Sequence, residues 1–348
     1  MALGASLKKE SRAMRIATAL FVSPLLLAAN LTSGFAHEDS AAVDSMIAMF
    51  DDGVIVGEPK IVDCTLSGGT KTSCLSITVK SNLTENDMGP WCPRNISDGP
   101  DEAGIWLHEG KRYDADGSFV ENLATFYGDP DWQLFDPANG NIRVTDSKAA
   151  CEAAARPDVD AAYNNYCVEC LTSYMDEEVL TTYVLPLHPV DQKTPSRVNG
   201  FGGIGLAFNG IKFDAPAPVD AILAAHTLAP FDDCGGHVNP HAGYHYHAAG
   251  GCSPETTSIS GHAAIIGIAL DGYPMTSRVD ADGSEPSDLD ACRGHLTDGL
   301  GYHYHVNEIG SNQTIGCFVA ETGCSLDDPD QICDASIVSN RRGPPPGE

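Results

Sequence analysis

The residues best suited to chemistry are histidines that recur in two copies of one pattern. In each copy a Cys-x-Gly-His segment is followed, after five residues, by Gly-Tyr-His-Tyr-His. The first copy runs from Cys234 to His247 and the second from Cys292 to His305, with identical internal spacing. A duplicated pattern of this kind indicates an internal repeat. The histidines that it contains at matching positions are His237, His245, His247, His295, His303 and His305.

The spacing within each copy suits metal coordination. Successive side chains of a β-strand point to opposite faces, so His245 and His247 are neighbours while Tyr244 and Tyr246 face the other way. The two histidine Cα atoms would lie about 6.5–7 Å apart, and His237, placed after a glycine in a loop, would supply a third imidazole. Three imidazoles favour zinc, copper, nickel or iron over calcium and magnesium, which prefer oxygen. We therefore predict that all six histidines are ligands of a divalent transition metal, with zinc, copper or iron as the candidates.

Several arrangements of these histidines remain open. If the copies pack about a pseudo-twofold axis, they form either two three-histidine clusters or one binuclear cluster of six. Without metal, the histidines and tyrosines would be structural ladders, hydrogen-bonded and packed. Cys234 and Cys292 are alternative thiolate ligands, although thiols of exported proteins oxidise.

Other polar residues have weaker claims to a role at the site. His108, His188, His226 and His262 are expected to be ordinary polar residues, with His262 the best placed to support the ligands. The candidate general bases of a metalloenzyme are Asp233, Asp271 and Asp290. The turns at 114–118 and 280–284 resemble the start of a calcium loop but do not complete one.

Two further segments show the same repeat. The apolar stretch 204–208 runs into Asn209-Gly210, and 266–270 runs into Asp271-Gly272, so both are predicted hairpins. Together with the histidine elements they make two units of about 60 residues each. In the first half of the chain, Pro59–Leu66 and Cys74–Lys80 are predicted strands of another hairpin. Helices are predicted from a capping box at Ser118 and Glu121, and over Ser147–Ala155.

The amino-terminal segment and the cysteines indicate export. Residues 1–36 combine four early basic residues with an apolar stretch and small residues, which is typical of a signal peptide cleaved after Ala36. All 12 cysteines follow this point, and an even number in an exported chain predicts disulfides. Cys167-Val168-Glu169-Cys170 could be a redox pair or half of a zinc site. With Cys92 and Cys151 nearby, we expect two structural bridges instead. The other predicted pairs are Cys64 with Cys74, Cys234 with Cys252, Cys292 with Cys317, and Cys324 with Cys333.

The net charge limits the partners of the protein. With 20 basic and 48 acidic residues, the formal net charge is −28 at pH 7. Such a surface repels nucleic acid and anionic lipid, and no segment after the signal approaches the length of a membrane span. We therefore expect no nucleic-acid partner and no stable membrane insertion once the signal is cleaved, while the identity of any small-molecule or polymer ligand stays open.

These patterns together predict a β-rich, disulfide-bonded α+β fold. The expected divisions are a signal peptide over 1–36, a Cys-linked α+β region over 37–195, a duplicated domain over 196–320 and an acidic, Pro-rich tail over 321–348. The duplicated domain is expected to hold a hairpin and a His-x-His strand in each unit.

The chain resembles the YHYH-domain proteins, whose tetrapeptide stands at Tyr244–His247 and again at Tyr302–His305. The resemblance covers most of the chain after the signal, and it departs at Pro274–Thr276, where related chains are more aromatic. It implies an exported protein but assigns no reaction. The further segments that carry it are 91–95, 104–106, 154–158, 207–210, 232–237 and 288–292.

The function that the sequence favours is transition-metal binding by an exported protein through its two histidine units. One alternative is a metal-dependent hydrolase or oxidase, in which the histidines leave a coordination position open. Another is a non-catalytic extracellular interaction domain whose histidines and tyrosines are structural.

Overall fold

The computed structural model describes residues 40, 43–81, 88–156, 158–175, 179–198, 202–240, 242–253, 255 and 261–337. Met1–Ala41 and Ala42–Glu348 are separate units, and every element below belongs to the second. The predicted signal peptide and its cleavage site lie outside the described residues. Along the described ranges, no helix is both long and apolar enough to cross a membrane.

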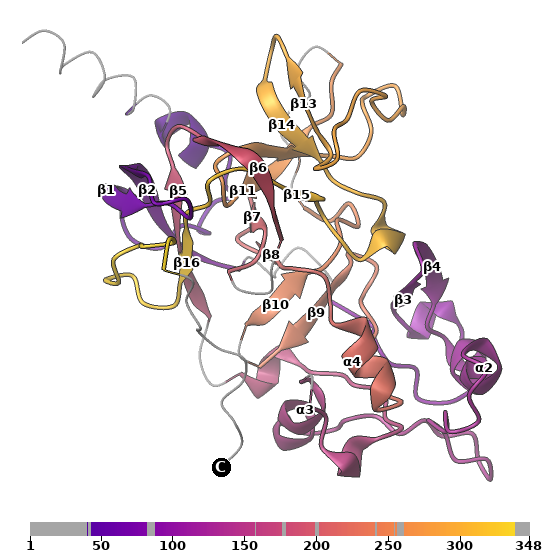
Figure 1. The fold of residues 1–348 in the computed structure, drawn as a ribbon. Coiled ribbons are helices and arrows are strands. Elements are labelled where there is room, and N and C mark those ends of the chain that lie inside the picture. The colour runs from indigo at the N-terminus through magenta and orange to yellow at the C-terminus, as the bar shows by residue number, and fades with distance from the viewer. Residues whose placement is uncertain are drawn as a thin grey trace, which may run out of the picture. The chain divides into compact units, whose positions relative to one another are not determined.

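An eight-stranded sheet carries both histidine elements (Figure 1). Its two halves are built alike, and each half is ordered from the centre of the sheet to one edge. The first half comprises β7 (Gly205–Ala207), β8 (Lys212–Phe213), β10 (Gly243–Tyr246) and β9 (Gly236–Asn239). The second comprises β11 (Ile265–Ala269), β12 (Pro274–Thr276), β14 (Gly301–His305) and β13 (Gly294–Thr297).

Strand directions show that the two halves are related by a pseudo-twofold axis. The central pair, β7 and β11, is antiparallel. In both halves the second hairpin strand pairs in parallel with the histidine strand, as β8 with β10 and β12 with β14. In both halves the histidine strand is antiparallel to the edge strand. The predicted duplication is therefore present, and it places the two histidine strands near opposite edges.

The predicted hairpins form at the two turns that contain glycine. Gly210 and Gly272 have φ values of +79° and +87°, a region that residues with a Cβ adopt only at a cost. A Cβ at Gly210 would also lie 2.1 Å from the carbonyl oxygen of Lys80. Strand β12 pairs with β11 over Pro274–Thr276, so the second hairpin forms as predicted.

Smaller sheets surround this one. The predicted amino-terminal hairpin is confirmed as β1 and β2, and the chain after Cys324, predicted as a tail, begins with strand β16 in the same sheet. That four-stranded sheet is ordered β1 (Lys60–Thr65), β2 (Lys71–Lys80), β5 (Leu180–Pro186) and β16 (Cys324–Leu326). The two-stranded sheets pair β6 (Asp191–Arg197) with β15 (Cys317–Ala320), and β3 (Ile105–His108) with β4 (Lys111–Asp114).

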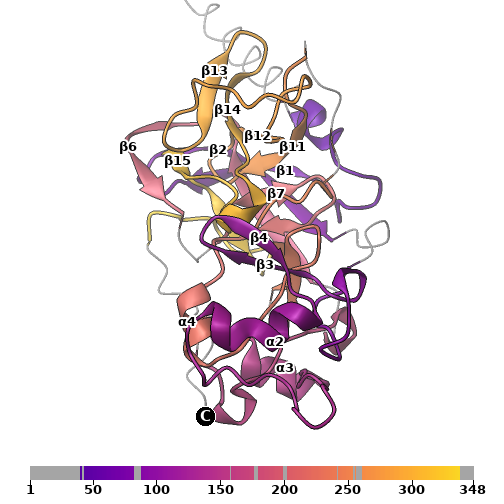
Figure 2. The ribbon, with the colours of Figure 1, turned by 90° about the vertical axis from the view of Figure 1, so that its right-hand side faces the viewer.

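Three α-helices gather at the end of this unit opposite β13 and β14, as both views show (Figures 1 and 2), while a short helical stretch over residues 43–47 lies apart from them. The three helices are α2 (Gly117–Phe126), α3 (Lys148–Ala154) and α4 (Val219–Ala224). The helix predicted over Ser147–Ala155 forms as α3, which Ser147 caps. The predicted capping box at Ser118 is wrong: Asp116 caps α2, because its carboxylate accepts the Phe119 N–H at 2.8 Å. Single 3-10 turns are η1 (Pro100–Glu102), η2 (Ala161–Tyr163), η3 (Thr172–Tyr174) and η4 (Ile309–Ser311).

Six disulfides join the chain, and no cysteine is free. The four predicted pairs of cysteines close together in the sequence all form: Cys64 with Cys74, Cys234 with Cys252, Cys292 with Cys317, and Cys324 with Cys333. Cys167 and Cys170 do not pair with each other, since they bond to Cys92 and Cys151 respectively. The β-rich, disulfide-bonded α+β class is confirmed, and the six bridges fit an extracellular protein.

Candidate metal centres

The six predicted histidines fall into two groups, and a seventh joins one of them. His237, His245 and His247 form what we call the three-histidine centre. The second group, the four-histidine centre, comprises His262, His295, His303 and His305. Within each group the candidate ligand nitrogens all lie within 4.8 Å of one another. Four strands of the sheet lie between the two histidine strands, β10 and β14, which are therefore five steps apart, or about 24 Å at ~4.8 Å per step. The six histidines therefore do not form one binuclear cluster.

Strand pairing explains why a third histidine joins each His-x-His pair. His237 was expected in a loop, but it lies on edge strand β9, directly opposite His245 on β10. His295 on β13 likewise lies opposite His303 on β14. Residues directly opposite one another in an antiparallel pair share a face, with Cβ atoms roughly 4.5–5.5 Å apart.

An aspartate turn fixes each edge strand. The Asp232 carboxylate accepts the N–H groups of Cys234 and Gly236 at 3.1 and 2.9 Å, and the Tyr244 hydroxyl at 2.7 Å. In the second copy, Asp290 makes the same three bonds to Cys292, Gly294 and Tyr302 at 2.8–2.9 Å. The first segment of the motif is thus Asp-x-Cys-x-Gly-His. The hydrogen bond from the first tyrosine of Gly-Tyr-His-Tyr-His to this aspartate holds the histidine strand and the edge strand together.

Hydrogen bonds fix the tautomers in the three-histidine centre. His245 Nδ1 lies 2.9 Å from the carbonyl oxygen of Gly243, and His247 Nδ1 lies 2.5 Å from that of Ala215. A carbonyl oxygen only accepts, so each Nδ1 carries a proton and donates it. In the neutral ring, Nε2 then carries a lone pair and no proton. Both Nε2 atoms are therefore available as ligands.

The same Nε2 atoms point at one another. His247 Nε2 lies 3.0 Å from His245 Nε2 and 3.2 Å from His237 Nε2. Two lone pairs at this distance repel unless a cation lies between them. A four-coordinate metal with bonds of about 2.0–2.1 Å holds its adjacent nitrogens about 2.8–3.4 Å apart, depending on geometry. The donor set thus fits a metal ion.

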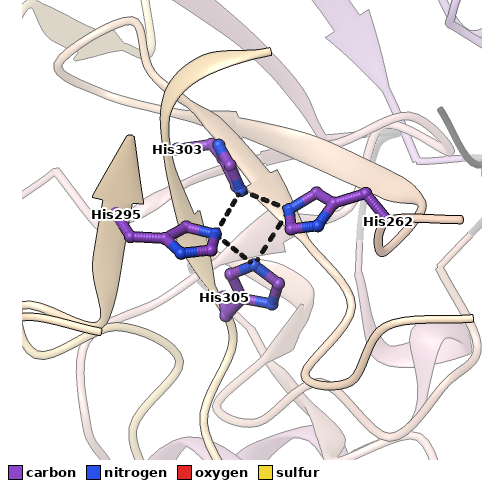
Figure 3. A group of neighbouring side chains, drawn as sticks. All are labelled: His262, His295, His303 and His305. Carbon is purple, nitrogen blue, oxygen red and sulfur yellow. Dashed lines mark hydrogen bonds between the residues drawn. The ribbon is translucent and has the colours of Figure 1, made fainter. Parts of the chain in front are cut away.

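The four-histidine centre repeats this arrangement with one more ring (Figure 3). His303 Nε2 lies 2.6 Å from His262 Nε2 and 3.1 Å from His295 Nε2. His305 Nε2 lies 3.2 Å from the same two atoms. All four Nε2 atoms face a common point, and the separations of 3.1–3.2 Å match the edges of a four-coordinate site, whereas the His262–His303 separation of 2.6 Å is shorter than such an edge.

The outer nitrogens of the four-histidine centre have partners of two kinds. His303 and His305 donate through Nδ1 to the carbonyl oxygens of Gly301 and Ser277. The other two rings contact carboxylates through Nδ1: Asp280 for His262 and Asp288 for His295, each at 2.8 Å. Carboxylate partners of this kind orient metal-binding histidines and raise their basicity.

His262 is the residue that sequence reasoning missed as a ligand. It was expected to support the ligands at most, but its Nε2 belongs to the cluster. The matching position in the first copy, Gly200, is not a histidine and lies outside the described residues, so the repeat held no signal for it. The turn at 280–284 held the only hint, since Asp280 there contacts His262 Nδ1 at 2.8 Å.

Burial favours the neutral imidazole at His247, His303 and His305. It lowers the pKa of His247 to about 3, with neighbouring His245 adding to the effect. Burial and the adjacent histidines also lower the pKa of His303 and His305 to about 4. Neutral imidazole is the form that binds metal, so protons compete little with a cation at neutral pH.

A cavity of about 380 Å³ opens onto the three-histidine centre, and all three rings line it. Asp214 lies in the same wall, where its carboxylate pairs with Lys212 Nζ at 3.0 Å. Burial opposes ionisation of Asp214, but the charge and hydrogen bond of Lys212 outweigh it and lower the pKa of the carboxyl to about 2. No histidine of the four-histidine centre lines this cavity.

The other candidates from the sequence have structural partners. Asp271 accepts the Tyr304 hydroxyl, Asp290 holds its turn, and Asp233 is an exposed partner of Arg112. Cys234 and Cys292 are in disulfides, which removes them as thiolate ligands. His188 is exposed, and His108 packs against the rings of Phe126 and Tyr127. His226 contacts Asp129 at 2.8 Å in a partly exposed group with Asp131.

Comparison with known proteins gives one result. Residues 182–287 match the family model described as YHYH protein. The matched stretch includes the three-histidine centre and His262, and it ends before His295. This match supports a YHYH-domain protein. No curated protein and no solved structure matches it.

Proposed function

We propose that this protein binds two transition-metal ions, one at each histidine centre. The observation that carries the proposal is the convergence of Nε2 lone pairs in rings whose Nδ1 protons are held by carbonyls. Structural histidines would instead present one donor to one acceptor at each contact. Zinc, copper and iron all suit imidazole ligands. The assigned ligands are His237, His245, His247, His262, His295, His303 and His305.

The two centres have different roles under this proposal. Four protein ligands close a coordination sphere, which is typical of structural zinc sites. Three ligands beside a cavity leave a position for another molecule, as in catalytic sites. The four-histidine centre thus stabilises the sheet, and the three-histidine centre captures or presents metal. Export through the segment 1–36 and disulfide formation outside the cytoplasm belong to the same proposal.

A second candidate function, a metal-dependent hydrolase or oxidase, is favoured by the cavity at the three-histidine centre. Its test is a hydrolase and oxidase screen of metal-loaded protein. Activity should disappear in His245→Ala and persist in His188→Ala, an exposed histidine outside both centres. Activity that survives in His245→Ala would exclude this centre.

Elemental analysis tests the binding proposal directly. Protein purified without added chelator should hold two equivalents of transition metal. His245→Ala and His303→Ala should each lose one equivalent, whereas His188→Ala should keep both. Less than a tenth of an equivalent in the unaltered protein would contradict the proposal. Anomalous scattering would locate each ion and distinguish the two centres.

A further inference from the structure

We infer that the three-histidine centre takes an exogenous ligand, a small and mostly apolar molecule with one anionic oxygen donor group. This inference rests on the proposed function, because the donor group would bind the metal there. It adds the chemical class of the ligand and its location in the cavity of about 380 Å³.

Charge balance distinguishes the centre that needs an anion. At the four-histidine centre, the carboxylates of Asp280 and Asp288 contact two of the rings and balance the two charges of a divalent ion. At the three-histidine centre, the Nδ1 partners of His245 and His247 are neutral carbonyls. A divalent ion buried among neutral ligands is strongly stabilised by an anion.

The charged groups around the cavity are already paired with one another. Asp214 pairs with Lys212, and Glu169 binds Arg94 Nη2 at 2.5 Å and the Cys92 N–H at 3.1 Å. Arg156 forms a two-point pair with Asp158, at 2.7 and 2.6 Å. None of these pairs leaves a net charge to balance the ion. A ligand with one anionic donor group would supply it.

The walls of the cavity indicate the size and polarity of the part of the ligand beyond its donor group. They are largely apolar and come from the end of α3, from α4 and the segment before it, and from the segments 168–170 and 227–230. The cavity size lies near the lower end of the roughly 300–1,000 Å³ typical of small-molecule sites. An aromatic or short aliphatic body therefore fits better than a sugar or a peptide. The apolar wall includes Trp91, Ala155, Val168, Pro218, Ile222 and Val238.

Cobalt-substituted protein tests the inference, because the visible spectrum of cobalt(II) changes when its coordination changes. The full chain is loaded with cobalt and titrated with acetohydroxamate and with phenylacetohydroxamate. Both should alter the spectrum, and the aromatic probe should bind about tenfold tighter or more, the effect of removing one ring from water. His245→Ala should keep one cobalt, in the four-histidine centre, and lose the response.

Matched substitutions at the end of α3 test the cavity, one at its last turn and one at its C-cap residue Ala155. Ala155→Phe places a ring at the cavity wall and should weaken phenylacetohydroxamate about tenfold or more without lowering the cobalt content. Ala153→Phe, two residues earlier and outside the cavity lining, should leave the affinity unchanged. If Ala155→Phe does not fold, Ile222→Phe on α4 replaces it.

The two possible failures are distinguishable. A protein that binds no cobalt contradicts the proposed function and this inference with it. If the protein binds two cobalt ions, three results would contradict the inference and leave the proposed function intact. Neither probe would change the cobalt spectrum, the two probes would bind with equal affinity, or the spectral response would persist in His245→Ala. Equal loss of affinity in Ala155→Phe and Ala153→Phe would overturn the assignment to the cavity.

Discussion

The two histidine centres come from the same repeat and have the same strand pairing, yet they differ in ligands and charge. The repeat supplies three rings to each, through the His-x-His strand and the histidine opposite it. Loops outside the shared motif supply the rest: His262, Asp280 and Asp288 join one centre, whereas a cavity adjoins the other. A duplicated scaffold thus acquires two different sites by changing its loops.

The hairpin turns differ in a related way. Asn209 in the first copy donates its side-chain amide to the Tyr246 hydroxyl at 3.1 Å. In the second copy the equivalent residue is Asp271, which accepts the Tyr304 hydroxyl at 2.6 Å. The change from the amide nitrogen of Asn209 to a carboxylate oxygen of Asp271 therefore exchanges a neutral donor for a buried, ionisable acceptor. This acceptor lies in the half of the sheet that carries the four-histidine centre.

The largest expected effect comes from Asp271. Burial raises the pKa of its carboxyl to about 7, against hydrogen bonds from Tyr304 and Ala320 that lower it. The folded state then binds more protons than the unfolded state between about pH 4 and 7, so the free energy of unfolding falls as pH rises through this window. Full stabilisation is present below about pH 4, and about 4 kcal/mol is lost by pH 7.

Asp271→Asn, which copies the first unit, should remove this pH dependence. Denaturant unfolding of metal-free protein at pH 5, 6, 7 and 8 measures the difference between the two proteins. The corresponding change at the first turn, Asn209→Asp, should create a similar fall. Parallel pH profiles for the original protein and Asp271→Asn would contradict a raised pKa.

Removing His262 should make the two centres alike. The free energy of zinc binding at a structural site is roughly 10–16 kcal/mol, so one of four equal ligands contributes about 2.5–4 kcal/mol of it. His262→Ala should therefore weaken metal at this centre about 100- to 1,000-fold, measured by competition with a chromogenic chelator. His188→Ala is the control, and an unchanged affinity in His262→Ala would show that only three rings bind.

The carboxylate partners should have a smaller effect, confined to one centre. Asp288→Asn removes the charge beside His295 while keeping the size of the side chain. We expect a loss of about 10- to 100-fold in affinity at the four-histidine centre. The three-histidine centre, which is assayed in the same titration, should not change. A loss shared by both centres would point to a general change in folding instead.

The smallest effect concerns the glycine of each Asp-x-Cys-x-Gly-His turn. A Cβ at Gly236 would lie 2.5 Å from the Tyr244 hydroxyl, and a Cβ at Gly294 would lie 2.0 Å from that of Tyr302. Tyr244 is buried, while Tyr302 is only half-buried and can move away. Gly236→Ala should thus lower the free energy of unfolding by about 1–3 kcal/mol and Gly294→Ala by less. Thermal unfolding measures both, and the reverse order would contradict this account.

The sequence by itself determined the local parts of this protein. Alternation along Gly-Tyr-His-Tyr-His placed two imidazoles on one face, and Asn-Gly and Asp-Gly predicted the hairpin turns. The cysteine pairs were predictable because five of the six bridges link residues 9 to 25 positions apart. In each case the relevant contacts lie within a short stretch of chain, where strand geometry and turn chemistry decide the outcome.

Only the tertiary structure decided how many centres there are and what completes each one. The antiparallel pairing of β7 with β11 sends the two histidine strands to opposite edges, which a single repeat unit does not specify. His262 reaches its centre from a loop 41 positions before His303, and the cavity wall comes from α3, more than 80 residues before His237. Contacts between residues so distant in sequence depend on how whole elements pack, and no local pattern encodes them.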